Sequence, residues 1–443
     1  MYMGNRQSRG KGGAMKDESI LYWIWLAERC GPASKDVGRL VEKYPDPYDV
    51  YRLDTEELER VEGISPSLKL KLADKSLEEA YSTLKYCRQK KIDLISYESD
   101  RYPSRLRTLE DPPALLFVKG KMPDLNNRLC IAMVGTRKMS EYGCESAYRI
   151  SYELASANAV IVSGMALGID GVSACGALSA GGTTVAVLGC GISVAYPKEH
   201  KYLSDEIAKH GAVITEYMPK ERPNGYNFPK RNRIISGLCQ GVLVVEGASG
   251  SGALITARRA IDQGRVLFAL PGKINESNSE GPNELIKNGA LVALSADDII
   301  SQFDFLYHDC INYKGLGKAK STSSFVDSAL KKYRVSGIYK REDMYRPQPE
   351  PIIEKIDATP VSASAEIREA NAPVRQETVR NDSFEGLDEV SVKVLLAMPH
   401  DRGVTPDALD VEGVDIGQII TAFTMLEING YVDSLPGGTY IRK

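Results

Sequence analysis

Histidine is scarce in this chain of 443 residues, which has only four, and its eight cysteines stand singly with no Cys-x-x-Cys pair. Protein metal sites draw mainly on clustered histidine, cysteine and carboxylate side chains. The sequence therefore predicts no bound metal, and we expect no cofactor. Isolated cysteines also fit a reducing compartment, where thiols remain free.

Long apolar runs are missing as well. No window approaches the ~20 uninterrupted apolar residues that cross a membrane. The first residues, MYMGNRQSRGKGGAMKDES, lack the apolar core of a signal peptide. We expect residues 1–16 to form a disordered tail, and we expect a cytoplasmic protein with no membrane partner.

Strong charge of either sign is also lacking, since the formal net charge is −3. This balance excludes a generally basic nucleic-acid coat protein, but it leaves room for a basic groove on a nearly neutral body. Any charged partner must therefore be inferred from a local site.

The length favours two or three domains over a single core. Residues 17–91 show short amphipathic helical patterns, and the turn VEGIS lies between two of them. These features predict a small helical domain of the helix-hairpin-helix or SAM-like kind. Such a turn either aims backbone N–H groups at a phosphate or simply connects two helices.

Residues 92–305 alternate short β-branched runs, such as LCIAMV, TTVAVL and GVLVV, with amphipathic helices. Apolar strands separated by helices predict an α/β fold with a doubly wound parallel sheet. Ligands of such sheets bind at the carboxyl ends of the strands, so the loops there are the candidate site.

Residues 306–385 lose this periodicity and are rich in Lys, Pro, Ser and Glu, as expected of a linker. Residues 386–443 then show three short helical runs, a strand, a PGG turn and another strand, which predict a winged-helix-like domain. Its segment DIGQIITAFTMLEING carries no lysine or arginine. A structural or protein-contact role is therefore favoured over the reading of DNA bases.

Two loops after strands carry polar groups suited to a ligand. MVGTRKMSEYG places Gly135, Thr136 and Arg137 before a helix, where free N–H groups and the helix dipole favour a phosphate. VSGMALGID supplies Ser163 and Gly164, and the glycines of this loop allow a ligand to approach the backbone closely. Asp170 in that loop is a candidate general base, base-edge acceptor or helix cap, and the cap is favoured.

Two glycine-rich loops resemble nucleotide motifs incompletely. LGCGISVAYPKEH begins like a dinucleotide fingerprint, but Val194 replaces its third glycine and Tyr196-Pro197 interrupts the helix that should follow. VVEGASGSGALIT offers an anion cradle at residues 249–252. It lacks the lysine of a Walker A loop, so triphosphate hydrolysis is not indicated.

The most basic stretch is MPKERPNGYNFPKRNR, from Met218 to Arg233, with five positive residues against Glu221 alone. Tyr226 and Phe228 lie among these charges. Basic groups that follow phosphates and aromatic faces that stack on bases are the two components of single-strand binding. Phe228 either faces such a strand or anchors the loop in the core. The sequence shows neither the spacing of a catalytic triad nor a pair of carboxylates on these loops. It therefore does not indicate an enzyme.

Taken together, the motifs YESDRYPSRLRTLEDPPALLFVKG, MVGTRKMSEYG, IVSGMALGIDGVSACGAL, NFPKRNRIISGL and VVEGASGSGALITARRAIDQGR resemble the DNA-processing protein A (DprA/Smf) family. The resemblance covers about residues 93–305. It implies an extended Rossmann-like fold that binds and protects single-stranded DNA, forms a homodimer and loads the RecA recombinase during natural transformation.

The resemblance also implies the DNA-binding residues. They are Gly135, Thr136, Arg137, Ser163, Gly164, Ala166, Phe228, Lys230, Arg231, Asn232, Arg233, Ser249, Gly250, Ser251 and Gly252. Leu167 departs from the family pattern, in which many relatives carry an arginine, and one phosphate contact is lost with it. The length of the linker has no counterpart in a compact member of the family.

A related group of enzymes with the same broad fold provides the alternative. These LOG-type phosphoribohydrolases act on nucleoside monophosphates through a PGGxGTxxE motif. Aligning ASGSGALIT with that motif places Thr256 at the position of the catalytic glutamate. Because hydrolysis needs that carboxylate as a general acid or base, the binding protein is preferred to the enzyme.

Overall fold

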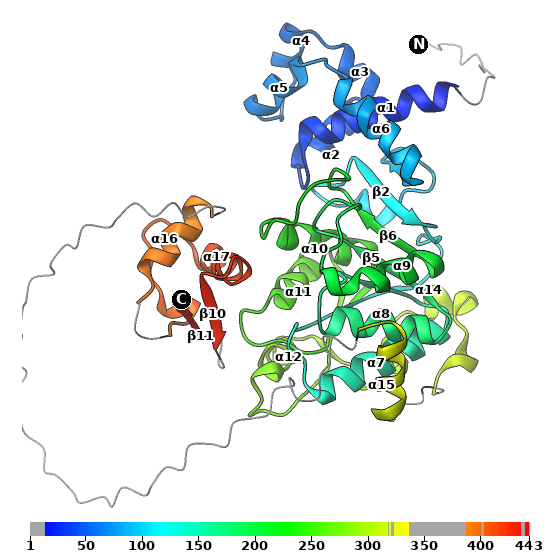
Figure 1. The fold of residues 1–443 in the computed structure, drawn as a ribbon, viewed down its shortest axis with the longest axis vertical. Coiled ribbons are helices and arrows are strands. Elements are labelled where there is room, and N and C mark those ends of the chain that lie inside the picture. The colour runs from blue at the N-terminus through cyan, green and yellow to red at the C-terminus, as the bar shows by residue number, and fades with distance from the viewer. Residues whose placement is uncertain are drawn as a thin grey trace, which may run out of the picture.

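The computed structural model describes residues 14–317, 319, 323–335, 387–399, 403–435 and 439–442. These residues form an N-terminal helical unit, a central unit built on one large sheet, and a small C-terminal unit (Figure 1). Residues 1–13 of the expected tail and residues 336–385 of the expected linker lie outside the described residues.

The central sheet has nine strands in the order β1-β2-β6-β5-β4-β3-β7-β8-β9. Strands β3 to β9 run parallel, whereas β2 pairs antiparallel with β6 and β1 pairs antiparallel with β2. The predicted parallel sheet is thus confirmed, and an antiparallel pair extends one edge. The strands are β1 (Asp93–Ser96), β2 (Leu115–Gly120), β3 (Cys130–Val134), β4 (Val160–Ser163), β5 (Thr183–Val187), β6 (Ala212–Thr215), β7 (Gly241–Val244), β8 (Val266–Ala269) and β9 (Leu291–Val292).

Helices cover both faces of this sheet. Along β3, Ile131 and Met133 pack into one apolar cluster with α7 and α8, while Cys130 and Ala132 pack into a second cluster with α10 and α11. Two-sided burial explains why the strands read as continuous apolar runs. The helices are α7 (Glu141–Ser156), α8 (Ile169–Ser179), α9 (Lys201–His210), α10 (Asn227–Leu238), α11 (Gly252–Asp262), α12 (Ser277–Lys287), α13 (Ala296–Ile300), α14 (Asp304–Tyr307) and α15 (Ser323–Lys332).

The strand order reverses between β3 and β7. The chain passes from β3 through β4 and β5 to β6 on one side, and then returns to place β7 on the other side of β3. Helices α7 and α11, which follow these two strands, therefore diverge to opposite faces. Ligands of doubly wound sheets commonly bind in the crevice outside such a switch point.

Part of the segment expected to be a linker is a packed helix. In α15, Val326 and Leu330 are buried, and the following Tyr333 is buried with them against α7 and α8. The three positions recur at helical spacing, so this helix contributes an apolar stripe to the core. The prediction of a linker from residue 306 is corrected: ordered structure of the central unit continues to residue 335.

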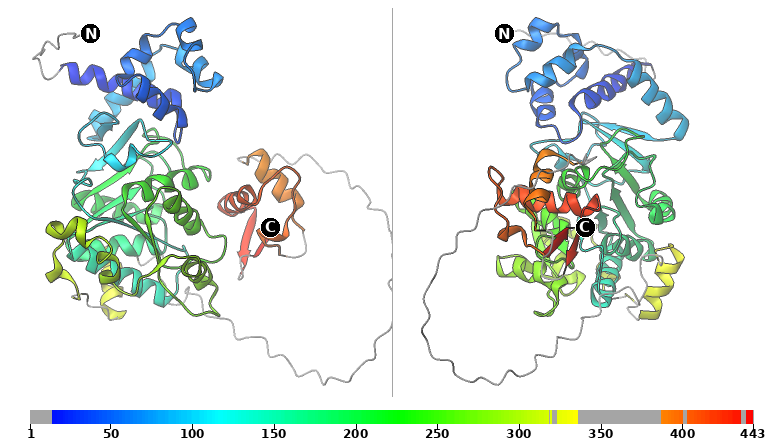
Figure 2. Two further views of the ribbon diagram at one scale, coloured as in Figure 1. Left: turned by 180° about the vertical axis from the view of Figure 1, so that it is seen from behind. Right: turned by 60° about the vertical axis from the view of Figure 1, so that its left-hand side comes forward.

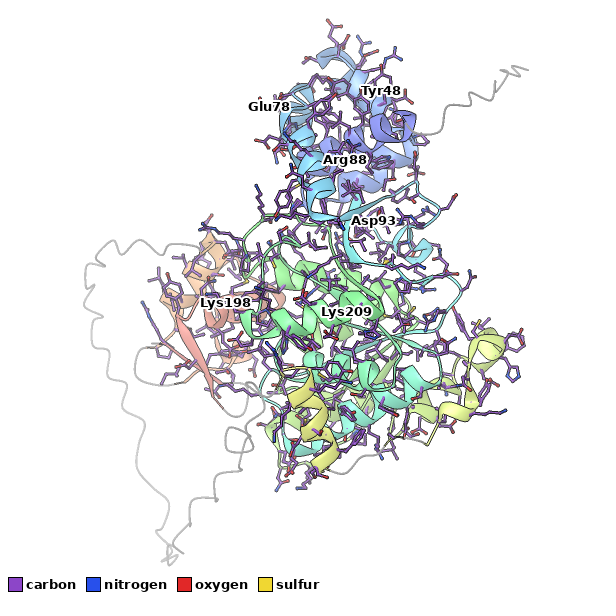
Figure 3. The ribbon with its side chains drawn as sticks, turned by 45° about the vertical axis from the view of Figure 1, so that its right-hand side comes forward. Tyr48, Glu78, Arg88, Asp93, Lys198 and Lys209 are labelled. Carbon is purple, nitrogen blue, oxygen red and sulfur yellow. The ribbon has the colours of Figure 1, made fainter. Side chains whose placement is uncertain are left out.

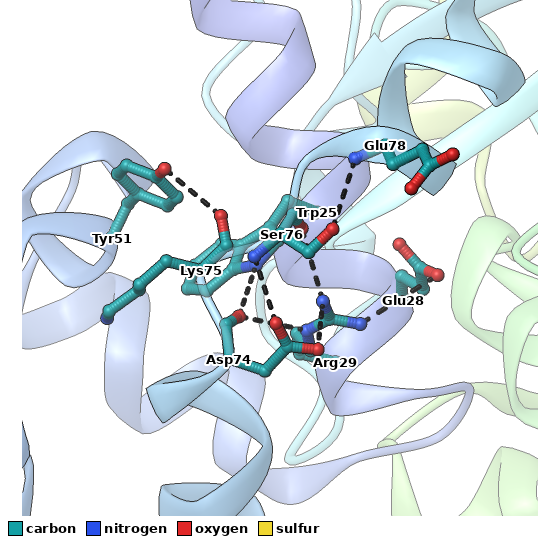
Figure 4. Close-up of polar contacts among 8 residues, drawn as sticks. All are labelled: Trp25, Glu28, Arg29, Tyr51, Asp74, Lys75, Ser76 and Glu78. Atoms are coloured by element: carbon teal, nitrogen blue, oxygen red, sulfur yellow. Dashed lines mark hydrogen bonds and ion pairs between the residues drawn. The ribbon is translucent and has the colours of Figure 1, made fainter.

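The N-terminal unit packs its helices around buried tryptophans. The segment before α6 is tied to α1 by Trp25 Nε1, which donates to the Asp74 carbonyl at 3.2 Å, and by Arg29, which contacts the Asp74 carboxylate at 2.9 Å (Figure 4). Arg88 and Asp93, labelled in Figure 3, mark where this unit meets the sheet. The helices are α1 (Ala14–Cys30), α2 (Lys35–Lys43), α3 (Pro47–Arg52), α4 (Thr55–Glu59), α5 (Pro66–Ala73) and α6 (Glu78–Lys90).

The turn VEGIS joins α4 to α5. Gly63 has a φ of +81°, a conformation that favours glycine, and its carbonyl accepts a bond of 2.6 Å from Arg39 Nη1 of α2. This contact ties the turn to the helical unit itself. The structure therefore favours the connector role over a phosphate-binding role for this turn.

The C-terminal unit contains α16 (Glu389–Ala397), α17 (Ile416–Ile428) and the hairpin of β10 (Val432–Leu435) and β11 (Thr439–Arg442). The ring of Phe423 stacks on that of Tyr440 at 4.4 Å in its core. Of the three helical runs predicted, two are α-helices and one is a 3-10 turn. The unit lies beside α10 and α11 (Figures 1 and 2), where the Asp388 N–H donates to Tyr226 Oη.

Candidate nucleic-acid interface

A pocket of about 350 Å³ opens at the carboxyl ends of β3, β4 and β5. Four chain segments meet there: the loops that follow these three strands and the first turns of α10. Its lining residues are Arg137, Gly164, Ala166, Leu167, Leu188, Gly189, Cys190, Tyr196, Pro197, Lys198, Glu199, Phe228 and Arg231. The pocket thus lies at the edge of the sheet where ligands of this fold class bind.

Five of the residues predicted for the site line this pocket, namely Arg137, Gly164, Ala166, Phe228 and Arg231. The others do not line it. Among these, Lys230 is exposed and Asn232 is half-buried on α10. Ser249 to Ser251 lie in the loop between β7 and α11, and Gly252 is the first residue of α11. The structure therefore brings only part of the predicted set together at the ends of β3, β4 and β5.

Phe228 forms a wall of the pocket and is half-buried. Its ring lies 5.2 Å from that of Tyr196, centroid to centroid, and 5.8 Å from the Arg231 guanidinium carbon. A Cβ on Gly189 would come within 2.8 Å of the ring, so the glycine allows this close packing. Phe228 thus presents an aromatic face to the opening and is not an anchor in the sheet core.

Arg231 shapes the pocket floor from within, since only 5% of the residue is exposed. Its Nη1 donates to the Gly164 carbonyl at 2.9 Å and also to the Val187 carbonyl, while Nε donates to Asn232 Oδ1 at 3.1 Å. The guanidinium thereby joins the ends of β4 and β5. Arg231 thus braces the pocket floor and lines the pocket, and its expected contact with DNA stays a prediction.

Arg233 is even more buried and lies away from the pocket. It is 2% exposed, and its guanidinium contacts Glu216 at 2.6 Å and Asp111 at 3.0 Å. Glu216 also accepts from the Ala33 N–H at 3.2 Å, which links the N-terminal unit to the sheet. The structure argues against the expected contact of Arg233 with DNA, because the side chain is buried within this ion-pair network.

Ser163 is fully buried, and its hydroxyl accepts from the Met165 N–H at 3.3 Å. It therefore supports the loop after β4, and its burial argues against the predicted contact with DNA. Asp170 has a similar task, since its carboxylate accepts from the N–H groups of Gly164 at 2.8 Å and Ala166 at 3.3 Å. Gly168 occupies the N-cap of α8, so Asp170 closes the loop rather than capping the helix.

Burial raises the pKa of Asp170 from 3.8 to about 6, although Arg231 lies close enough to oppose that rise. Because the folded state favours the neutral carboxyl, this group contributes stability that is complete below the unfolded pKa near 4 and is lost as the pH rises through about 6. Asp170→Asn keeps an oxygen for both N–H groups. It should raise the free energy of unfolding by roughly 1–3 kcal/mol near pH 8 and have little effect near pH 4.

Urea unfolding of Asp170→Asn and the unchanged chain, followed at both pH values, checks this prediction. A stabilisation that is equal at the two pH values would contradict the assignment of the pH dependence to Asp170.

Glu246 occupies part of the predicted anion cradle at the start of α7. The Ser140 N–H donates to Glu246 Oε2 at 2.9 Å, and the Thr136 N–H donates to the Glu246 carbonyl at 2.8 Å. A Cβ on Gly135 would lie 2.5 Å from the Ile169 side chain. The Thr136 N–H is therefore occupied by the chain itself, which argues against its predicted phosphate contact, while the predicted contact of Gly135 stays a prediction.

The pocket also includes residues that the sequence did not single out. Tyr196, Lys198 and Glu199 come from the loop after β5, and both charged side chains are exposed. The loop VAVLGCGISVAYPKEHKYL also carries the family resemblance, but none of its residues was predicted to contact DNA. Its run YPK combines an aromatic residue, a proline and a lysine, as FPK does in FPKRNR. This similarity was the sequence feature that could have predicted its place in the site.

Across the residues that the structure describes, no group of three or more His, Cys, Asp or Glu side chains could hold a metal ion. Within the same residues, no helix is long and apolar enough to span a membrane. The pocket is lined by aromatic, basic and acidic side chains and by glycines.

Comparisons with known proteins match the same region. A family model described as DNA recombination-mediator protein A matches residues 93–304. DNA processing protein DprA of Bacillus subtilis (strain 168) is 42% identical over 215 residues, which are 48% of this chain and 72% of that protein. Protein Smf of Synechocystis is 27% identical over 97% of this chain and 100% of its own.

Among solved structures, DNA processing protein A of Streptococcus pneumoniae matches with a TM-score of 0.56 at 35% identity, over 64% of this chain and 97% of that one. The sequence matches and the structural match are all to proteins named DprA or Smf, and the match to the solved structure confirms the Rossmann-like fold. The chain therefore belongs to the DNA recombination-mediator protein A family, which includes proteins named DprA and Smf.

Proposed function

We propose that this protein binds single-stranded DNA without sequence preference, with the phosphate backbone along the basic rim of the pocket and a base against its aromatic wall. The observation that carries the proposal is the grouping of Phe228 and Tyr196 with the exposed Arg137 and Lys198 around one opening. Stacking and charge together are what single-strand binding requires. Membership of a family of recombination mediators supports the same function.

The bound strand would then be protected and passed to the RecA recombinase during DNA uptake, in the cytoplasm. Support for this step comes from the family description and from relatives named DNA processing proteins. Of the expected contacts, Lys230 and Ser249 to Gly252 would continue the DNA path beyond the pocket, since Lys230 is exposed and the loop is at least partly exposed.

Binding of fluorescein-labelled oligo-dT, followed by anisotropy at several salt concentrations, tests the proposal. The logarithm of the affinity should fall linearly with the logarithm of salt concentration, by about 0.7 per phosphate neutralised. Phe228→Leu should weaken binding by roughly 1–3 kcal/mol, since stacking is lost, whereas Phe228→Tyr keeps the ring and should bind nearly as well. Equal loss in both variants would count against stacking on this ring.

The proposal includes no catalytic role. Thr256 of α11 is 2% exposed and stands where the related hydrolases carry their glutamate. The hydrolase alternative predicts release of free base from a nucleoside monophosphate, and we expect none.

We also propose that the protein is a homodimer through the open edge of the sheet. Strand β9 is the last in the strand order, and Leu291, Val292 and Leu294 on this edge are 39%, 44% and 56% exposed. An unpaired edge with apolar side chains is a ready surface for pairing with another chain. Charges placed on such an edge oppose this pairing.

Leu291→Lys with Leu294→Lys should therefore convert the dimer to a monomer, as measured by sedimentation equilibrium. Leu70→Lys replaces a leucine that is 74% exposed on α5 and serves as the matched control, which should remain dimeric. A double variant with unchanged mass would place the dimer surface elsewhere.

The three units are proposed to be separate domains, with a winged-helix-like C-terminal domain that contacts protein rather than DNA bases. Helix α17 lacks lysine and arginine throughout. A helix without basic residues has little attraction to the phosphates that flank a DNA groove.

A further inference from the structure

The switch point of the sheet, between β3 and β7, is closed by a side chain of the protein. In a doubly wound sheet this position faces the N-terminus of the helix after the first strand, here α7, a helix of 16 residues. Free N–H groups and the helix dipole at such a terminus attract phosphate. The pocket described above lies to one side, at the ends of β4 and β5.

Glu246, which follows β7, occupies this place. It is 1% exposed, and its Oε2 accepts from the Ser140 N–H at 2.9 Å while Oε1 accepts from the Ser140 hydroxyl. That hydroxyl caps α7 by accepting from the Gly143 N–H at 3.0 Å. The carboxylate therefore takes up the N–H and hydroxyl donors of Ser140, which a phosphate at this terminus would use.

The surrounding backbone is fitted to this carboxylate. A Cβ added at Gly143 would collide with all three terminal atoms of Glu246, so only glycine allows the carboxylate to lie against the first turn of α7. The Thr136 N–H, which also faces this position, donates to the Glu246 carbonyl at 2.8 Å. One residue thus engages N–H groups from both sides of the β3 to α7 loop.

We propose that Glu246 is a specificity-determining residue, whose carboxylate stands in for a ligand phosphate at α7 and so rejects free phosphate and mononucleotides. Its negative charge repels a second anion, and its volume fills the site. A nucleic-acid strand therefore binds at the open pocket and its rim, and not at the N-terminus of α7. The exclusion holds whether or not DNA binds there, so the two proposals can fail independently.

Glu246→Ala and the isosteric control Glu246→Gln test this exclusion. Removal of the carboxylate should expose the donors at α7, whereas glutamine keeps the volume and an oxygen for the Ser140 N–H. Isothermal titration with inorganic phosphate, and separately with AMP, should show binding to Glu246→Ala at least tenfold tighter than to the unchanged chain. Glu246→Gln keeps the volume but removes the charge, so its affinity for phosphate should lie between those of the unchanged chain and Glu246→Ala. The affinity of the alanine variant for oligo-dT should change less than twofold.

Rescue by formate provides a second measurement. Formate can replace the missing carboxylate, so it should raise the melting temperature of Glu246→Ala, or restore its folding if the variant is unstable, without raising that of the unchanged chain. The proposal is overturned if the alanine variant gains neither phosphate binding nor formate rescue. It is equally overturned if the unchanged chain or Glu246→Gln binds phosphate as tightly as the alanine variant.

Discussion

Arg137→Glu combined with Lys198→Glu should lower the affinity for oligo-dT by about 100-fold. Both side chains are exposed at the rim of the pocket, on loops that follow different strands. A hydrogen bond to a charged group contributes roughly 1.5–3 kcal/mol, so the loss of two contacts corresponds to about 3 kcal/mol or more. Reversal adds repulsion between the new carboxylates and the phosphates.

The matched control is Lys209→Glu. Lys198 begins the 3-10 turn before α9, and Lys209 lies near the other end of α9; both are labelled in Figure 3. Lys209 is exposed and forms an ion pair of 2.6 Å with Glu206 at the surface of α9, so its reversal should cost little stability. The control should bind within about threefold of the unchanged chain after allowance for net charge. Comparable losses in both variants would show that total charge, and not the pocket, governs binding.

Arg233→Met should destabilise the central unit by about 3–5 kcal/mol. The substitution leaves Glu216, which is 8% exposed, as a buried carboxylate without its ion-pair partner. Breaking one side of a buried pair is costly because the remaining charge cannot be solvated. The change should lower the midpoint of urea unfolding, observed by circular dichroism.

Two further variants make this result specific. Arg222→Met removes a basic residue that is exposed in the same segment and should change the free energy of unfolding by no more than about 0.5 kcal/mol. Adding Glu216→Gln to Arg233→Met removes the orphaned charge and should recover part of the loss. A small effect of Arg233→Met, equal to that of Arg222→Met, would contradict the buried network.

The parallel part of the sheet could be predicted because its strands are buried on both faces. Residues such as Ile131 and Ala132 point to opposite sides of β3 and are both apolar, which produces a continuous run. The edge strand β1 has only four residues, and two of them are only half-buried. Its antiparallel pairing with β2 depends on a partner about 20 residues away, which no local pattern specifies.

Composition and periodicity predict different structures for the segment of α15, a linker and a helix. Two of its serines and both lysines are exposed, while Val326 and Leu330 repeat at the spacing of a helix and are buried. The surrounding Lys- and Ser-rich sequence resembles a linker, but the apolar stripe alone predicts a helix that packs on a core.

The arginines of FPKRNR show where prediction from sequence ends. Arg231 and Arg233 are two positions apart and equally basic, yet one braces the pocket floor and the other joins a buried network. Their roles depend on carbonyl and carboxylate groups from other strands, such as Val187 and Glu216. The local sequence predicts positive charge, but only the fold determines which charges remain free.

A crystal structure of the full chain with a short oligo-dT tests the central claim most directly. The account predicts phosphates beside Arg137 and Lys198 and a base against the ring of Phe228, with Glu246 still bonded to Ser140. Phosphates on another face of the molecule, with the pocket at the ends of β4 and β5 empty, would contradict it.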